Sequence, residues 1–160
     1  MSDLASPPQA AAIFGPRLPL AEQFVELLGD SGIRHGLLGP RERPRLWERH
    51  VLNCAVVAAL LPPAPGPQRL LDVGSGAGLP GLALAIARPD LEVHLVEPLT
   101  RRTAWLRDAV AALSLESVTV HTARAESLWG SLEAPCVTAR AVPGIAQLAQ
   151  WTFPRLTSDW

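Results

Sequence analysis

A glycine-rich turn from Asp72 to Gly81, with the sequence DVGSGAGLPG, constrains the fold of this chain more than any other feature. It follows an apolar segment, residues 69–73, which has the length and composition of a buried strand. It leads into a helical pattern over about residues 80–87. Glycines let the backbone approach a ligand closely, and the start of the next helix offers free N–H groups and the positive end of a dipole. The turn therefore predicts a ligand site at the carboxyl end of a strand.

The chain after this turn alternates between strand and helix patterns. Further strands are expected at residues 92–96, 117–121 and 136–139. Helices are expected at residues 100–113 and 144–153, with a short helix or turn at 125–128. Alternating strands and helices favour an α/β fold, in which a parallel sheet carries helices on both faces.

Two cofactor classes share this layout. Glu97 ends the second expected strand, where a carboxylate accepts hydrogen bonds from the ribose hydroxyls of an adenosine. Gly76, Gly78 and Gly81 satisfy the dinucleotide pattern, but this pattern starts later after the strand than is usual for NAD. Asp72 would repel a pyrophosphate and favours a cofactor with a sulfonium and an α-amino group. We therefore favour S-adenosylmethionine, and an NAD-dependent oxidoreductase is the weaker alternative.

Composition narrows the class of protein. At 160 residues the chain has the length of one domain, and its net charge of −1 provides no global field for nucleic acid. The N-terminus has no basic segment before an apolar run, so no signal peptide is expected. Cys54 and Cys136 lie far apart in different patterns, so neither a disulfide nor a metal site is expected. A soluble, cytoplasmic protein is the expectation.

The segment before the turn is expected to be largely helical. Residues 1–18 are expected to be disordered or loosely attached, and residues 19–66 to form a helical extension. This extension would contain a helix at 20–28, a loop at 32–44, a helix at 45–61 that two prolines end, and a stiff connector at 62–67. Residues 67–160 would then form the cofactor-binding domain.

Several motifs, in order, resemble the ribosomal RNA small subunit methyltransferase G family, also called glucose-inhibited division protein B, which methylates N7 of a guanine in 16S rRNA. The DVGSGAGLPG turn resembles the first motif of this family, and its Leu-Pro-Gly ending is unusual among methyltransferases. Residues 45–53, RLWERHVLN, resemble an upstream helix of the family. The downstream matches are Glu97 with Arg101 and Arg102, residues 124–126, and residues 138–141. The resemblance implies a Rossmann-like class I S-adenosylmethionine-dependent methyltransferase.

The turn and the resemblance together give a set of cofactor-binding residues. In the resemblance, Gly74 and Leu79 touch the cofactor, Glu97 meets the ribose, and Ala125 and Glu126 flank the adenine. The full set expected to bind the cofactor is Asp72, Gly74, Ser75, Gly76, Gly78, Leu79, Glu97, Ala125, Glu126 and Arg140. A solvated acid at Glu126 and a surface cation at Arg140 remain open as alternatives.

Methylation of guanine N7 needs no catalytic base, because N7 has an in-plane lone pair and no proton. Catalysis would then rest on positioning and desolvation. Arg140, which the resemblance places between cofactor and base, is the first catalytic candidate, since arginine can hold guanine O6 or a phosphate. His50 is the second, because the resemblance places its helix beside the cofactor cleft. A buried structural histidine is the alternative.

The expected partner is 16S rRNA, within the 30S subunit or a precursor of it. Residues 34–50 contain five arginines and two glutamates, with Trp47 among them for stacking. This segment is the candidate surface for the RNA backbone, and an ordinary solvated loop is the alternative.

The sequence departs from the family pattern after the fourth strand. In the family a fifth strand pairs beside the fourth, whereas here residues 154–160 match nothing in the pattern. The sequence therefore predicts a domain that is truncated after about four strands, in which residues 136–139 form an open edge of the sheet. A monomer is expected, and a dimer through this edge is conceivable. A remnant that binds S-adenosylmethionine without transferring a methyl group is the alternative function.

Overall fold

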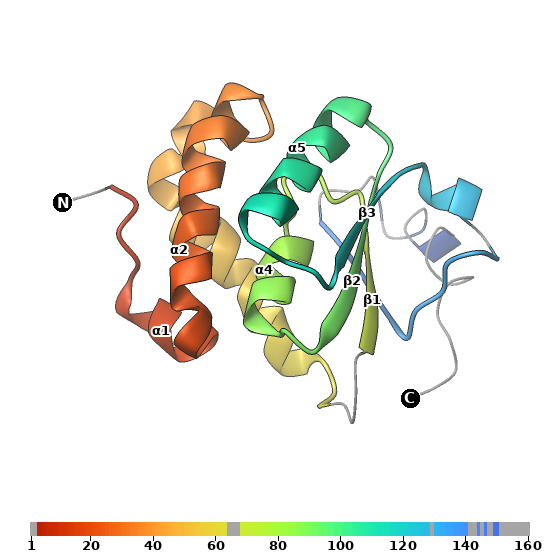
Figure 1. The fold of residues 1–160 in the computed structure, drawn as a ribbon, viewed down its shortest axis with the longest axis horizontal. Coiled ribbons are helices and arrows are strands. Elements are labelled where there is room, and N and C mark those ends of the chain that lie inside the picture. Colours follow the sequence, from red (N-terminus) through yellow and green to blue (C-terminus); the bar gives the residue numbers. More distant parts are fainter. Residues whose placement is uncertain are drawn as a thin grey trace.

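The computed structural model describes residues 3–63, 68–128 and 130–140, together with residues 144, 146, 149 and 150. At its centre lies a sheet of four parallel strands in the order β3-β2-β1-β4 (Figure 1). The strands are β1 (Gln68–Val73), β2 (Leu91–Glu97), β3 (Val118–Thr122) and β4 (Cys136–Ala139). The predicted strands and their parallel arrangement are confirmed, and the boundaries differ by one residue or none.

The register aligns the carboxyl ends of the central strands. Val73 of β1 pairs with Val96 of β2 on one side and with Ala139 of β4 on the other. Gly74 and Arg140, which follow β1 and β4, and Glu97, the last residue of β2, therefore lie at one edge of the sheet. In open parallel sheets this edge is the usual place for a ligand site.

The central strands β1 and β2 are buried on both faces, as their continuous apolar sequences require. Leu70, Val93 and Leu95 belong to the main core beneath the helices. Their neighbours Leu71 and Val96 point the other way and belong to a second, smaller cluster, which also contains Leu132 and Ala134 from the segment before β4.

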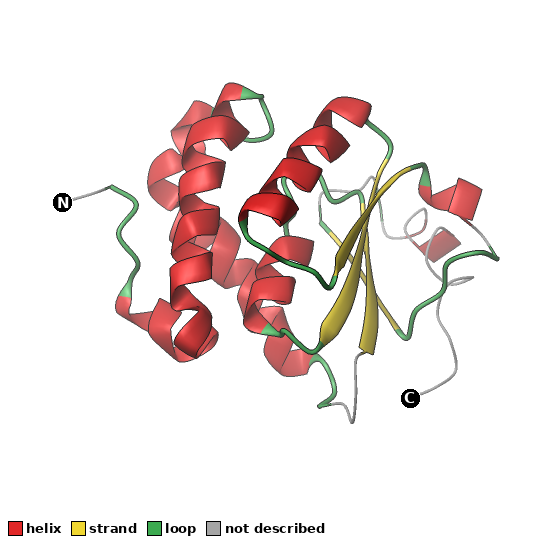
Figure 2. Cartoon of the chain, in the orientation of Figure 1, coloured by secondary structure: helices red, strands yellow, loops and turns green. Residues whose placement is uncertain are grey.

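The described α-helices that follow β1 and β2 lie on one side of the sheet. These are α4 (Gly81–Ala87) and α5 (Thr100–Ala112), and Figure 2 shows both on the side that faces the N-terminal helices. The opposite side carries the 3₁₀ turn η6 (Ala125–Leu128). The helix expected at residues 144–153 and the tail at 154–160 fall mostly or wholly outside the described residues.

The N-terminal segment folds onto the main core as a chain of short helical elements (Figure 1). They are α1 (Pro8–Phe14), η1 (Gly15–Arg17), α2 (Leu18–Leu27), η2 (Leu28–Gly32), η3 (Pro40–Arg45), η4 (Leu46–Leu52), α3 (Asn53–Ala55) and η5 (Val56–Leu60). The expected helix at 45–61 is confirmed as a helical run over 46–60. The expected loop at 32–44 is wrong at both ends, because residues 32–34 are helical and η3 begins at Pro40.

The prediction that residues 1–18 are disordered or loosely attached is wrong for the described residues. Leu4, Ala10 and Phe14 are buried in the main core, and the Phe14 ring packs edge-on against Trp47. The Arg17 side chain donates to the carbonyls of Ala85 and Ile86 at the end of α4. These tertiary contacts stabilise a helix that is too short to be stable by itself. The division at residues 66–67 remains a prediction.

The length and apolar character of a helix decide whether it can span a membrane. None of the helices within residues 3–63, 68–128 and 130–140 is long and apolar enough to cross a bilayer.

The burial of Phe14, the last residue of α1, predicts the effect of replacing its side chain with a methyl group. Phe14→Ala should lower the free energy of unfolding by about 3–5 kcal/mol, because it leaves a cavity in the main core. Gln9→Ala, on the exposed side of the same helix, should change it by less than about 0.5 kcal/mol. Urea unfolding of both variants measures the difference. Equal stability of the two variants would mean that α1 is not part of the core.

Candidate cofactor and substrate site

The glycine-rich turn connects β1 to α4 and folds back against β2. The N–H groups of Gly74 and Ser75 both donate to the carbonyl of Val96, at 2.8 and 3.2 Å. Gly78 has a φ of 80°, and a Cβ there would collide with the side chain of Leu82. Glycine is thus required at residue 78 for conformation and for space. The turn presents backbone rather than side chains to the carboxyl edge of the sheet.

Asp72 lies beneath this turn and does not line either of the cavities described below. Its carboxyl group is fully buried, and it accepts hydrogen bonds from the Gly81 N–H at 3.0 Å and the Thr138 hydroxyl at 3.3 Å. Burial raises the pKa of this carboxyl to about 7, and the hydrogen bonds from Gly81, Ser75 and Thr138 limit the rise. The geometry gives Asp72 the role of holding the turn instead of the predicted contact with the cofactor. Gly78 lines neither cavity either.

A cavity of about 410 Å³ opens between the ends of β1 and β2 and the turn before η6. Its volume is within the range of small-molecule sites. Four predicted cofactor residues line it, namely Gly74, Glu97, Ala125 and Glu126. The sequence therefore predicted correctly that these four residues, which lie up to 52 positions apart, line one cavity.

Glu97 is the acidic centre of this first cavity. Its Oε2 accepts from the Gly76 N–H at 3.2 Å, and its Oε1 accepts from the Leu99 N–H at 3.4 Å. The guanidinium of Arg102 lies 3.6 Å from Oε1. These contacts fix the carboxylate on the cavity wall, where it is suited to accept hydrogen bonds from a vicinal diol.

A second cavity of about 310 Å³ adjoins the first and shares Gly74 and Arg102 with it. The predicted residues on its wall are Gly74, Ser75, Gly76, Leu79, His50 and Arg140. The two cavities thus meet at the glycine turn, with Glu97 on the wall of the first and Arg140 on the wall of the second.

His50 and Arg140 meet in the second cavity, although they are 90 residues apart. His50 Nδ1 lies 2.8 Å from a terminal nitrogen of Arg140, and His50 Nε2 lies 2.6 Å from a carboxylate oxygen of Glu42. Arg140 also donates to the Cys54 sulfur at 3.6 Å. Both catalytic candidates thus belong to one hydrogen-bonded cluster.

Sequence reasoning assigned no cofactor role to Arg102 and did not single out Glu42. Arg102 belonged to a recognised motif, but nothing in the sequence showed that its side chain reaches both cavities. Its Nε is buried without a hydrogen-bond partner in the structure. Buried donors are normally paired, so a bound acceptor is a natural complement to this side chain. The cavity volumes, the Glu97 carboxylate and this unpaired donor fit an adenosyl cofactor with an amino-acid tail.

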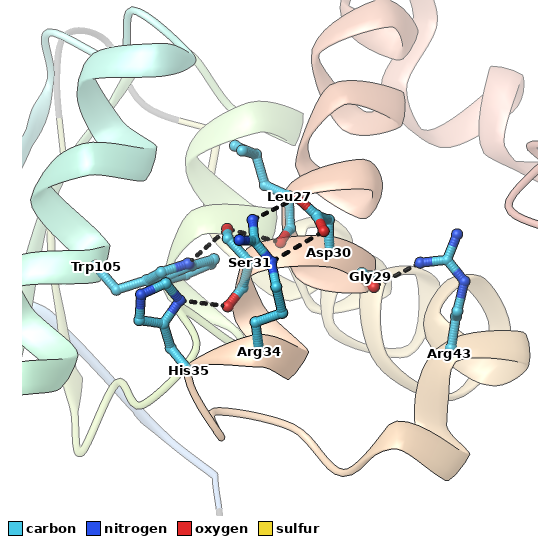
Figure 3. Close-up of polar contacts among 8 residues, drawn as sticks. All are labelled: Leu27, Gly29, Asp30, Ser31, Arg34, His35, Arg43 and Trp105. Atoms are coloured by element: carbon cyan, nitrogen blue, oxygen red, sulfur yellow. Dashed lines mark hydrogen bonds and ion pairs between the residues drawn. The ribbon is translucent and has the colours of Figure 1, made fainter.

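The predicted stacking role of Trp47 is wrong. The side chain is only 6% exposed, and its Nε1 donates to the carbonyl of Leu4. Most of the nearby arginines have intramolecular partners. Figure 3 shows Arg34 paired with Asp30 and Arg43 donating to the carbonyl of Gly29. The segment therefore offers less free positive charge than its composition suggested.

Solved structures share this fold at low sequence identity. One is a methyltransferase from Geobacter sulfurreducens, which was solved in complex with S-adenosyl-L-homocysteine. It is 19% identical, with a TM-score of 0.55, and the match covers 83% of this chain and 51% of that one. The parallel sheet with its glycine turn and acidic second strand is the fold of class I S-adenosylmethionine-dependent methyltransferases.

The family is defined by sequence. The family model of rRNA small subunit methyltransferase G, GidB, matches residues 17–159, and the chain belongs to this family. The ribosomal RNA small subunit methyltransferase G of Pseudarthrobacter chlorophenolicus is 57% identical over 92% of this chain and 67% of its own length. That of Thermobifida fusca is 50% identical over 98% of this chain and 65% of its own length. The chain spans about two thirds of the length of these relatives.

Asp72 makes the stability of the protein depend on pH. Between its ordinary pKa of 3.8 and its folded pKa of about 7, the folded protein holds a proton that the unfolded chain releases. The stabilisation by the bound proton is therefore complete below pH 3.8. It is lost as the pH rises to about 7, which lowers the free energy of unfolding by at most about 4 kcal/mol. Asp72→Asn keeps a carbonyl oxygen for Gly81 and cannot ionise.

Urea unfolding between pH 4.5 and pH 8 tests this linkage, because other titrating groups are common to both proteins. The stability of Asp72→Asn relative to wild type should increase with pH across this range. If the free energies of unfolding of wild type and Asp72→Asn changed with pH in parallel, Asp72 would not titrate between pH 4.5 and pH 8.

Proposed function

We propose that this chain binds S-adenosylmethionine across the two cavities and transfers its methyl group to N7 of a guanine in 16S rRNA. One observation carries the proposal. The first cavity contains a carboxylate suited to a ribose, the second contains an arginine suited to a base or a phosphate, and Gly74 borders both. Membership of the rRNA small subunit methyltransferase G family supports the same assignment.

In this proposal the first cavity holds the adenosine. Glu97 accepts hydrogen bonds from both ribose hydroxyls, since its carboxylate is already held in place by backbone N–H groups. Ala125 and Glu126 flank the adenine. The backbone of Gly74, Ser75 and Gly76, together with Leu79, borders the amino-acid tail in the second cavity. The bound cofactor supplies an electrophilic methyl group.

The residues of the second cavity orient the acceptor. Guanine N7 attacks through its lone pair, so the site needs no base, and the gain comes from alignment and from exclusion of water. Arg140 holds O6 of the guanine or a neighbouring phosphate and leaves N7 free. His50 acts on Arg140 and not on the guanine, because both of its ring nitrogens are already engaged.

The partner in this proposal is 16S rRNA within the 30S subunit or a precursor of it, in the cytoplasm. Arg41, Arg45, Arg101 and Arg124 are exposed and provide positive charge for phosphate contacts. Affinity for RNA should therefore fall with salt concentration. The protein acts as a monomer, with a dimer through the β4 edge as the alternative.

Arg140→Ala should lower methyl transfer at least about 100-fold, a loss typical of a group that aligns a reacting base. The assay follows tritium from labelled S-adenosylmethionine into 30S subunits that lack the modification, and mass spectrometry locates the methyl group. Arg107→Ala, which removes an exposed arginine on α5 away from both cavities, is the control and should retain full activity. Undiminished transfer by Arg140→Ala would remove Arg140 from the mechanism.

The same assay separates the alternative function. A chain that binds S-adenosylhomocysteine but transfers no methyl group to 30S subunits or to free 16S rRNA is a cofactor-binding remnant.

A further inference from the structure

Three side chains form a hydrogen-bonded row, two members of which, His50 and Arg140, line the second cavity. Glu42 comes from η3, His50 from η4, and Arg140 follows β4. The two contacts in the row measure 2.6 Å between Glu42 and His50 and 2.8 Å between His50 and Arg140. The His50 side chain is 7% exposed and that of Glu42 is 23% exposed. The row is thus mostly shielded from water, which strengthens its hydrogen bonds.

The chemistry of these groups determines where the proton of His50 lies. A guanidinium has only donors, so the ring nitrogen that faces Arg140, Nδ1, must accept and carries no proton. A neutral imidazole then carries its proton on Nε2, which donates to the carboxylate of Glu42. The opposite tautomer would place an N–H group against the guanidinium N–H groups. The carboxylate of Glu42, which can only accept, favours the same form of His50 from the other side of the ring.

We propose that Glu42 is a positioning residue of the methyl transfer site, which fixes the His50 tautomer and through it the direction of the Arg140 guanidinium. The proposal rests on the function proposed for Arg140. Arg140 is held at one terminal nitrogen by His50 and at the other by the Cys54 sulfur, so its plane is set at two points. Its remaining donor capacity is then available for the acceptor base.

Other contacts of Glu42 do not account for its position equally well. The nearest arginine, Arg49, lies 3.5 Å away and its side chain is 56% exposed, so this ion pair is weak. The hydrogen bond from His50 is the main cause of a pKa of Glu42 below its ordinary value, ahead of the nearby charges of Arg49 and Arg45. Glu42 is therefore ionised and directed at His50.

Nitrogen-15 NMR of histidine-labelled protein reads the tautomer without any need for activity. The chain has four histidines, and loss of signals in His50→Gln assigns those of His50. We expect a bare Nδ1 and a protonated Nε2 in the wild type. Glu42→Ala leaves Arg140 as the one partner that favours a bare Nδ1, so a detectable share of His50 should carry its proton on Nδ1. Glu42→Gln should retain the wild-type form, because its amide oxygen can still accept from Nε2. Glu48→Ala removes an exposed glutamate of the neighbouring element and should change nothing.

Kinetics with 30S subunits gives the second readout. Glu42→Ala should lower methyl transfer roughly tenfold, the scale seen when a group that orients a functional histidine is removed. Its affinity for S-adenosylhomocysteine should stay within about twofold of wild type, and Glu42→Gln should recover most of the lost rate. This pattern differs from unfolding, which would lower cofactor affinity as well.

Two results would overturn the proposal. One is a wild-type spectrum with a proton on Nδ1. The other is a Glu42→Ala variant that matches Glu48→Ala in tautomer and in rate. A wild-type chain that transfers no methyl group would instead contradict the proposed function, and the spectra would still decide whether Glu42 sets the tautomer.

Discussion

The buried carboxyl group of Asp72 joins the parts of the molecule on which the site depends. It lies at the end of β1, accepts from the first residue of α4, and contacts Thr138 on β4. One side chain thus links the central strand, the helix after the glycine turn and the neighbouring strand. Because the group is fully buried, its hydrogen bonds compete with no solvent. The shape of the turn, and with it the position of Gly74 between the two cavities, follows from this anchor.

The N-terminal helices complete the site as well as the core. They supply His50 to the wall of the second cavity and Glu42 as the partner of His50, and they pack against α4 through apolar residues of the main core. Arg140 arrives from the opposite side, after β4. The second cavity, to which we assign the acceptor, is therefore an interface between the helical segment and the sheet. A change that loosens this packing should affect acceptor alignment before it affects the binding of adenosine, whose residues follow β1, β2 and β3.

Local patterns predicted the sheet and four of the residues that line the first cavity. The glycine turn, Glu97 and residues 125–126 each follow a recognisable strand, and parallel strands bring their carboxyl ends together. Contacts between distant segments could not be predicted from local sequence patterns. No local signal shows that Arg140 meets His50, or that Glu42 completes the row. The burial of Trp47 and Phe14 likewise results from tertiary packing in the main core, which no local pattern predicts.

The central claim is that the described residues form a working site for S-adenosylmethionine, and thermal unfolding with added ligand tests it most directly. S-adenosylhomocysteine at a hundredfold excess over its dissociation constant should stabilise the folded chain by about 2.7 kcal/mol, which raises the unfolding midpoint. NAD at the same concentration should have no effect. A cooperative transition that S-adenosylhomocysteine leaves unmoved, or that NAD raises instead, would contradict the account.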